Sequence, residues 1–203
     1  SRAGEFSPKQ QDYLKRIHDG GKRLLGMVDA LIELSHNEAA ELCLYQSVND
    51  LSELLASVTS KLSEKHAKKQ INIDIQVDPQ VPCVIADRIR ISQVLLQLLR
   101  FYREHLPEGE SISLSASVAD QGQIRVEVAC QMAEATYETA KASFKGSAFN
   151  AEALSRSIDE QEIGLLLSKR MIEIHDGQIG IDLAEGGVAT CWFELPISRS
   201  VSK

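Results

Sequence analysis

The sequence predicts a two-layer α/β sandwich preceded by one long bundle helix. Three observations lead to this prediction. A helical pattern of apolar residues runs through the first part of the chain, five later segments alternate apolar and polar residues as strands do, and three further helical segments are interspersed with those strands. The order of these segments is typical of a mixed, mostly antiparallel sheet with helices packed on one face.

The long helix is predicted from Ser7 to about Ser35. Ser7, Pro8 and Gln10 form a capping box with proline at the first helical position. Apolar or small residues then recur at alternating steps of three and four, as in a coiled-coil seam. Because such a helix cannot bury its seam alone, we expect an antiparallel hairpin or a dimeric bundle. The alternative is a helix that lies flat on its own domain. The predicted seam consists of Leu14, Ile17, Gly21, Leu24, Val28, Leu31 and Ser35.

The remaining elements follow from the two hydrophobic periodicities and from turn residues. The predicted helices span about 49–68, 87–104 and 161–175, and the predicted strands span 71–77, 112–118, 124–128, 178–183 and 189–195. Gly177 is expected to end the last helix from the C-cap position. Residues 131–160 are rich in Ala, Ser and Glu and are predicted to be a mobile or loosely helical lid.

Composition and charge exclude several classes of protein. The chain has 203 residues, of which 43% are hydrophobic and 25% charged, so wholesale disorder is excluded. A net charge of −7 disfavours nucleic acid and anionic membrane as partners. No stretch approaches the ~20 apolar residues of a membrane span, and no signal peptide opens the sequence. The four cysteines form no Cys-x-x-Cys pair, which favours buried reduced thiols and no metal site.

Several motifs occur together, in an order and at a spacing that resemble a sensor histidine kinase. They are the stretches 86–96, 163–170, 175–179 and 190–196. The resemblance covers about 7–198. It implies that residues 7–46 are the second helix of a dimerisation and phosphotransfer hairpin with its linker. It also implies that residues 47–203 are a catalytic, ATP-binding domain of the GHKL (Bergerat) type, with a degenerate lid at 131–160. Residues 1–6 look like a cloning remnant.

The resemblance places three nucleotide-site positions on the helix predicted at 87–104. In the family this helix carries two asparagines four residues apart, the second of which ligates magnesium, and a lysine follows near the phosphates. The matching residues here are Gln97, Phe101 and Glu104. Phenylalanine offers no oxygen to a hard cation, and glutamate has the wrong sign for a triphosphate.

Two glycine-containing nucleotide motifs of the family are also changed. The family's Asp-x-Gly-x-Gly, whose aspartate takes the adenine amino group, is replaced by Cys130-Gln131-Met132-Ala133-Glu134. In the phosphate cradle at 160–165 only Gly164 is kept, and Glu160 and Glu162 stand where phosphate oxygens would lie.

These losses together predict that the chain has no catalytic residue and no ATP or magnesium cofactor. Each lost charged hydrogen bond costs about 1.5–3 kcal/mol, and three such losses would weaken a micromolar site to millimolar or beyond. The positions that remain are vestigial. The vestigial nucleotide-site positions are Gln97, Phe101, Glu104, Cys130 and Gly164.

The resemblance, combined with these replacements, predicts a histidine-kinase-like signalling module of a two-component system that is a pseudo-kinase. Such a module acts by protein–protein interaction. Its expected partners are a second copy of the chain or another histidine kinase, and a response-regulator receiver domain. We expect no nucleic-acid or membrane contact by this segment and a cytoplasmic location, either alone or as the cytoplasmic part of a larger sensor. The residues expected to make the helix contact are Leu14, Ile17, Leu24, Val28 and Leu31.

Two alternatives stay open, so enzyme activity is undecided. The first is an atypical active histidine kinase that holds metal through Gln97, Glu104 or Glu134 and phosphorylates a histidine on the hairpin's first helix. The second is a phosphotransferase with a degenerate GHKL domain that relays phosphate between receiver domains. That relay needs a histidine on the first helix or His18, which is followed by an acidic residue as phosphoacceptor histidines are.

Overall fold

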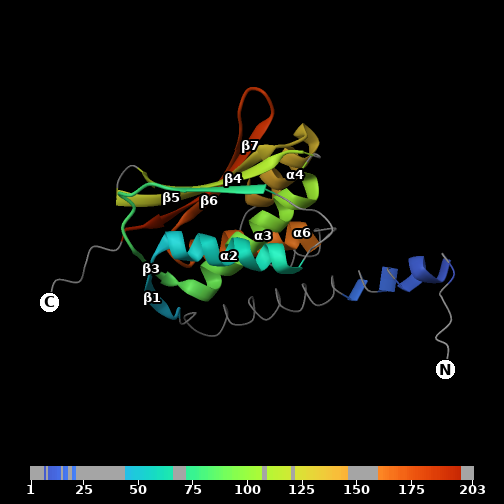
Figure 1. Cartoon of the computed structure of the whole chain (residues 1–203), viewed down its shortest axis with the longest axis horizontal. Coiled ribbons are helices and arrows are strands. Elements are labelled where there is room, and N and C mark those ends of the chain that lie inside the picture. Colours follow the sequence, from blue (N-terminus) through green and yellow to red (C-terminus); the bar gives the residue numbers. More distant parts are fainter. Residues whose placement is uncertain are drawn as a thin grey trace.

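A five-stranded mixed sheet and a layer of helices on one of its faces form the body of the protein (Figure 1). The computed structural model describes residues 7, 9–14, 16–17, 20–21, 44–65, 72–106, 109–119, 122–145 and 160–197. The strands lie in the order β2-β4-β5-β7-β6. They are β2 (Asn72–Val77), β4 (Ser111–Ala119), β5 (Gln123–Gln131), β6 (Gln178–Leu183) and β7 (Val188–Pro196). β2 and β4 run parallel, and the other neighbouring pairs of this sheet run antiparallel.

The helix layer consists of α2, α3 and α6, which lie together below the sheet in Figure 1. Their bounds are α2 (Leu51–Lys65), α3 (Arg88–His105) and α6 (Glu160–Glu173). The three helices and five strands predicted for this part of the chain are present, each end within three residues of the prediction. The predicted two-layer sandwich with a mixed sheet is therefore confirmed.

Alternation along the strands separates the buried face of the sheet from the open one. In β5, Ile124, Val126 and Val128 are fully buried against the helices, whereas Arg125 and Glu127 between them lie on the opposite face and are partly exposed. α3 supplies the apolar side of the helix layer. Its buried residues are Ile91, Val94, Leu95, Leu98, Leu99, Phe101 and Tyr102.

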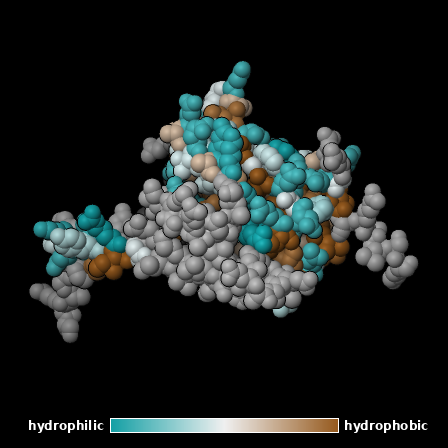
Figure 2. Space-filling model, turned by 180° about the vertical axis from the view of Figure 1, so that it is seen from behind, coloured by the Kyte–Doolittle hydropathy of each residue, from teal (hydrophilic) through white to brown (hydrophobic). Residues whose placement is uncertain are grey.

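The structure also contains a second, two-stranded sheet that was not predicted. β1 (Gln46–Asn49) pairs antiparallel with β3 (Val84–Asp87), and the Asn49 side chain donates a hydrogen bond to the Ala86 carbonyl oxygen at 2.9 Å. Four-residue strands are too short for their alternation to be distinguished from a loop. Four large apolar residues on and beside this sheet are exposed, and we call them the β1–β3 apolar patch. They are Tyr45, Val48, Ile85 and Ile89. Hydrophobic surface is visible at this end of the molecule in Figure 2.

The stretch 131–160, predicted as a loosely ordered lid, contains a regular helix in its described part. α4 (Glu134–Lys145) lies beside α6 and β6 and buries Tyr137, Ala140 and Phe144. The Lys169 ammonium group of α6 donates a hydrogen bond to the Phe144 carbonyl oxygen at 2.8 Å. Residues 146–159 lie outside the described residues.

The left-handed residue that ends the last helix lies one position earlier than predicted, and α6 itself ends at Glu173. Asp176, and not Gly177, takes the left-handed conformation, with φ of 57°. Its N–H donates to the Glu173 carbonyl oxygen, and the Gly177 N–H donates to the Ile172 carbonyl oxygen, which is the pattern of a Schellman motif. Gly177 is required for a different reason, because a Cβ atom there would lie 2.2 Å from the Glu194 backbone oxygen.

The capping box of the long helix is formed as predicted. The Ser7 N–H donates to Gln10 Oε1 at 2.9 Å, and the Gln10 N–H donates to Ser7 Oγ at 3.4 Å. Residues 9–14, 16–17 and 20–21 are helical. Leu14 and Ile17 are 46% and 72% exposed, so these two seam residues have no cover within the described structure. The other interaction residues, Leu24, Val28 and Leu31, and also His18, lie outside the described residues.

Candidate functional site

The five positions predicted to be vestigial lie on α3, α6 and β5, and α3 contacts both of the other elements. Gln97, Phe101 and Glu104 lie at spacings of four and three residues on α3, and side chains so spaced share one side of a helix. Gly164 lies in the first half of α6, and Cys130 lies near the end of β5. Contacts between these elements bring positions far apart in sequence into one region.

The Gln97 side chain fills the contact between α3 and α6. A Cβ atom on Gly164 would lie only 2.9 Å from Gln97 Oε1, so the glycine makes room for this amide. The Gly164 carbonyl oxygen accepts a hydrogen bond from the buried Ser168 hydroxyl at 2.8 Å. The kept glycine therefore serves the packing of two helices in this structure.

Glu104 is engaged by residues of this chain. Its carboxylate accepts a hydrogen bond from the Gln161 side-chain amide of α6. The guanidinium group of Arg103 lies 3.8 Å from the same carboxylate. The hydrogen bond between Glu104 and Gln161 thus links α3 to α6 at the position where the resemblance places a phosphate-binding lysine.

Phe101 is 4% exposed and belongs to the hydrophobic core. Its ring meets Tyr102 edge-on at 5.9 Å between centroids and lies 4.7 Å from the His105 ring. The position that would carry the second asparagine therefore presents an aromatic hydrocarbon to other rings, and it offers no ligand to a cation.

Cys130 and Met132, at the positions of the family's aspartate and first glycine, both point into the core. They are 5% and 6% exposed. Burial raises the pKa of the Cys130 thiol to about 11, and the negative charge of Glu110 adds to the rise. The thiol is therefore neutral near pH 7. Its sulfur lies 3.2 Å from the Gln131 carbonyl oxygen, to which it donates.

Tyr102 is a residue of this region that the sequence reasoning missed. It is fully buried, and its hydroxyl accepts a hydrogen bond from the Cys191 N–H at 2.6 Å and donates to the Ala189 carbonyl oxygen at 3.2 Å. Burial raises the pKa of this hydroxyl, and the Cys191 and Cys130 thiols add to the rise. One signal in the sequence could have indicated this residue. A tyrosine on the apolar side of the predicted helix 87–104 must find a hydrogen-bond partner for its hydroxyl when it is buried.

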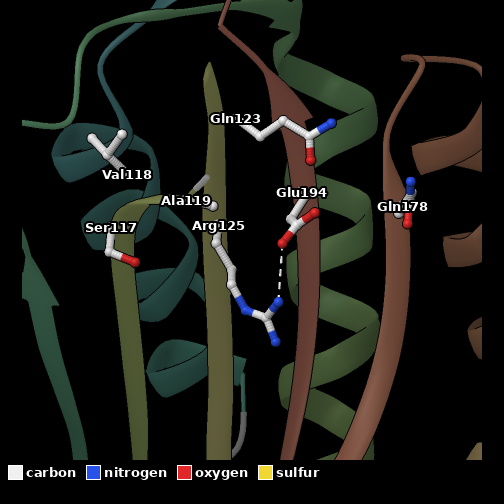
Figure 3. A pocket seen from close by; sticks show the side chains of 7 residues that line it. All are labelled: Ser117, Val118, Ala119, Gln123, Arg125, Gln178 and Glu194. Carbon is white, nitrogen blue, oxygen red and sulfur yellow. Dashed lines mark hydrogen bonds and ion pairs between the residues drawn. The ribbon is translucent and has the colours of Figure 1, made fainter. Parts of the chain in front are cut away.

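A separate hollow of about 520 Å³ lies on the open face of the sheet, in front of the strands in Figure 3, with the helices behind them. Arg125 is the positively charged residue among those that line it. Its guanidinium group donates to Glu194 Oε1 at 2.9 Å and to Glu127 Oε1 at 2.8 Å, and it stacks on the Trp192 ring at 4.2 Å. Because these partners occupy the guanidinium group, Arg125 links β5 to β7 through Glu194 and Trp192. The lining residues are Ser117, Val118, Ala119, Gln123, Arg125, Gln178 and Glu194.

The described part of the chain holds neither a group of metal-ligating side chains nor a helix suited to a membrane. Within it, no three His, Cys, Asp or Glu side chains are grouped closely enough to hold a metal ion. Its helices include none with the length and apolar character that a membrane crossing requires. Glu104 and Glu134, two of the residues considered for an alternative metal site, belong to no such group in the described structure.

Comparison with known proteins gives a family match and several relatives. Residues 86–199 match the family described as histidine kinase-, DNA gyrase B-, and HSP90-like ATPase. The chain is 26% identical to the sensor histidine kinase GacS of Pseudomonas protegens, over 97% of this chain and 22% of that protein. It is 27% identical to the circadian input-output histidine kinase CikA of Synechococcus elongatus, over 93% of this chain and 26% of that protein. The chain thus spans about a quarter of the length of each of these two relatives.

Solved structures share the fold. Full-length ShkA in complex with AMPPNP has a TM-score of 0.68 and 24% identity, and the match covers 95% of this chain and 40% of that chain. The histidine kinase ThkA in complex with the response regulator protein TrrA has a TM-score of 0.68 and 23% identity, and the match covers 97% of this chain and 54% of that chain.

Proposed function

The chain belongs to the histidine kinase-, DNA gyrase B- and HSP90-like ATPase family, and from this membership we propose that it is a pseudo-kinase module of two-component signalling. It has lost ordinary Mg-ATP binding and acts through contacts with other proteins. The fold of a kinase catalytic domain is kept for its shape and for its link to the long helix.

The burial of Phe101 is the observation that carries this proposal. A magnesium ion bridging ATP phosphates needs oxygen ligands from the protein. Here the ring at the ligand position is 4% exposed and packs against Tyr102 and His105. An oxygen could be supplied there only by another residue, and the Glu104 carboxylate, three residues along α3, already accepts a hydrogen bond from Gln161.

Charge at the phosphate side supports the same conclusion. Glu104 and Glu162 lie on the two helices that would face the phosphates, and Glu104 already pairs with Gln161 and Arg103. A triphosphate brought to this place would meet like charge. On the base side, the neutral Cys130 thiol replaces a carboxylate, and a hydrogen bond to a charged group contributes about 1.5–3 kcal/mol.

Isothermal titration of the protein with Mg-ATP tests the loss of nucleotide binding. We expect no saturable heat that corresponds to a Kd tighter than about 1 mM, because three polar contacts of the family's site are missing. Mg-GTP titrated in parallel reports non-specific binding of phosphates. A Kd for Mg-ATP in the low micromolar range, with weaker Mg-GTP binding, would contradict the proposal.

Exposed apolar residues support the second half of the proposal, action by protein contact. Leu14 and Ile17 lie 46% and 72% exposed on the long helix. In the folded domain, the β1–β3 apolar patch adds four more exposed large side chains. Contiguous exposed apolar surface marks interaction sites. A second copy or another kinase of this fold is the proposed partner of the helix. A receiver domain is proposed as a further partner, since ThkA was solved with its response regulator.

Sedimentation velocity tests the helix contact. We expect the protein to be a dimer and the double variant Leu14→Glu/Ile17→Glu to be a monomer, because two charges would be placed in the seam. The control is Lys9→Glu, at an exposed position before the seam. It changes the net charge by the same two units and should leave the dimer intact. A dimer that survives the double variant would show that the seam is not the contact.

A further inference from the structure

We infer that the Tyr102 side chain occupies the place of the nucleotide base, so that the vestigial site is closed by a residue of the core. Removing this ring should create a pocket for a planar aromatic molecule of purine size. This inference rests on the proposed function, because it explains how a domain of this fold is closed to nucleotide.

The position of the Tyr102 ring follows from the partners at its two ends. Its backbone lies on α3, next to Phe101 at the family's metal-ligand position. Its hydroxyl lies at β7, bonded to the carbonyl oxygen of Ala189 and the N–H of Cys191. Ala189 is the residue directly opposite Cys130 in the β5–β7 ladder. The ring therefore spans from the metal position to the strand segment beside the base position.

The space around the ring is filled by the chain itself. Tyr102 is 0% exposed and is among the largest fully buried side chains of the described structure. Phe101 packs edge-on against it at 5.9 Å. Met132 is buried at the position of the family's first glycine, where a small residue would let a nucleotide approach. A flat base and the phenol ring cannot occupy this space together.

The two hydrogen bonds of the hydroxyl hold the ring in place. If the side chain swung out, the hydrogen bonds of its hydroxyl to the Cys191 N–H and the Ala189 carbonyl oxygen would be broken. Losing two buried hydrogen bonds together with the packing of a fully buried ring is costly. The ring is therefore a permanent part of the folded domain, and a ligand should enter only when the ring is removed by mutation.

Thermal unfolding of Tyr102→Ala in the presence of free adenine tests the inference. Adenine at ten times its Kd should raise the Tm of this variant by roughly 3–6 °C. It should leave the Tm of the wild type and of Tyr102→Phe unchanged, because both keep the ring. Phe193→Ala is the matched control. It removes another fully buried aromatic ring, from β7, and leaves the Tyr102 ring in place.

Tyr102→Leu provides a second reading should the alanine variant fail to fold. Leucine keeps much of the apolar volume but removes the plane and the hydroxyl, so adenine should still raise its Tm, by less than in Tyr102→Ala. No rise in any folded Tyr102 variant, or an equal rise in Phe193→Ala, would overturn the inference and leave the proposed function standing. Micromolar Mg-ATP binding by the wild type would overturn the proposed function itself.

Discussion

At the scale of single residues, Asp87 illustrates which motif positions this chain has kept. Its carboxylate caps α3 by accepting from the Ile89 and Arg90 N–H groups at 3.0 and 3.2 Å, and it also accepts from the Tyr45 N–H at 3.1 Å. Its own N–H donates to His175 Nε2 at 3.1 Å, directly after α6. Asp87 thus connects the start of β1, α3 and the segment after α6 by hydrogen bonds. The folded domain needs these contacts whether or not a nucleotide binds.

The replaced positions show the opposite behaviour. Gln97, Phe101 and Cys130 stand where the family resemblance places contacts to metal and base, and each is now packed against other side chains or buried in the core. Sequence reasoning could find these positions because the motifs around them are recognisable. It could not find Tyr102, because its importance comes from the distant backbone groups of Ala189 and Cys191, which only folding brings to it.

The cysteines of the described structure should differ in how fast their thiols react. With iodoacetamide at pH 8, the exposed Cys83 should react in the folded protein, whereas the buried Cys130 and Cys191 should react only after unfolding. The exposed position of Cys83 corrects the expectation that the thiols are buried. Mass spectrometry of the labelled peptides gives the three rates, and equal rates in the folded protein would contradict the packing described.

The pKa of Cys130 adds a dependence on pH. Because burial raises this pKa to about 11 in the folded protein, the folded state keeps the proton that the unfolded chain loses above about pH 9. This thiol should therefore lower the free energy of unfolding as pH rises from about 9 to 11 and have no such effect below that range. Urea unfolding of wild type and Cys130→Ala at pH 7.5 and 10 measures the difference. A stability loss at pH 10 that is equal in both would contradict it.

At the scale of elements, periodicity predicted the long strands and helices because their side chains repeat over several turns or pleats. β1 and β3 escaped prediction since each has four residues and depends on its partner for hydrogen bonds. α4 escaped as a regular helix because Tyr137, Ala140 and Phe144 form an apolar stripe of only three residues. Tertiary contacts with α6 and β6 complete it.

The turn after α6 should be sensitive to substitution at Gly177 and tolerant of substitution at Asp176. Gly177→Ala should destabilise the protein by about 2–4 kcal/mol, because its Cβ atom would meet the Glu194 backbone oxygen at 2.2 Å and the Ile172 side chain at 2.8 Å. Asp176→Gly is the matched control, since glycine adopts the φ of 57° without strain, and it should change stability by about 1 kcal/mol or less. Urea unfolding followed by circular dichroism measures both. Equal effects of the two substitutions would contradict the close approach at Gly177.

At the scale of the whole molecule, the predicted sandwich and its family were correct because the order of elements and the motif residues point to the same fold. Sequence alone could name the five nucleotide-site positions but not the contacts that their side chains make in this protein. The closing contacts join α3 to α6 and α3 to β7, and they depend on distances between elements that no periodicity contains. The pairing of the long helix remains a prediction, tested by the seam variants.

The proposed closure of the nucleotide site by this protein's own side chains can be measured residue by residue. The most direct test is an NMR titration of the isotopically labelled protein with Mg-ATP, in which the backbone amides of Gln97, Tyr102, Cys130 and Gly164 are followed. We expect that these four signals do not shift saturably up to about 1 mM nucleotide. Saturable shifts of the same four signals at micromolar Mg-ATP would contradict it.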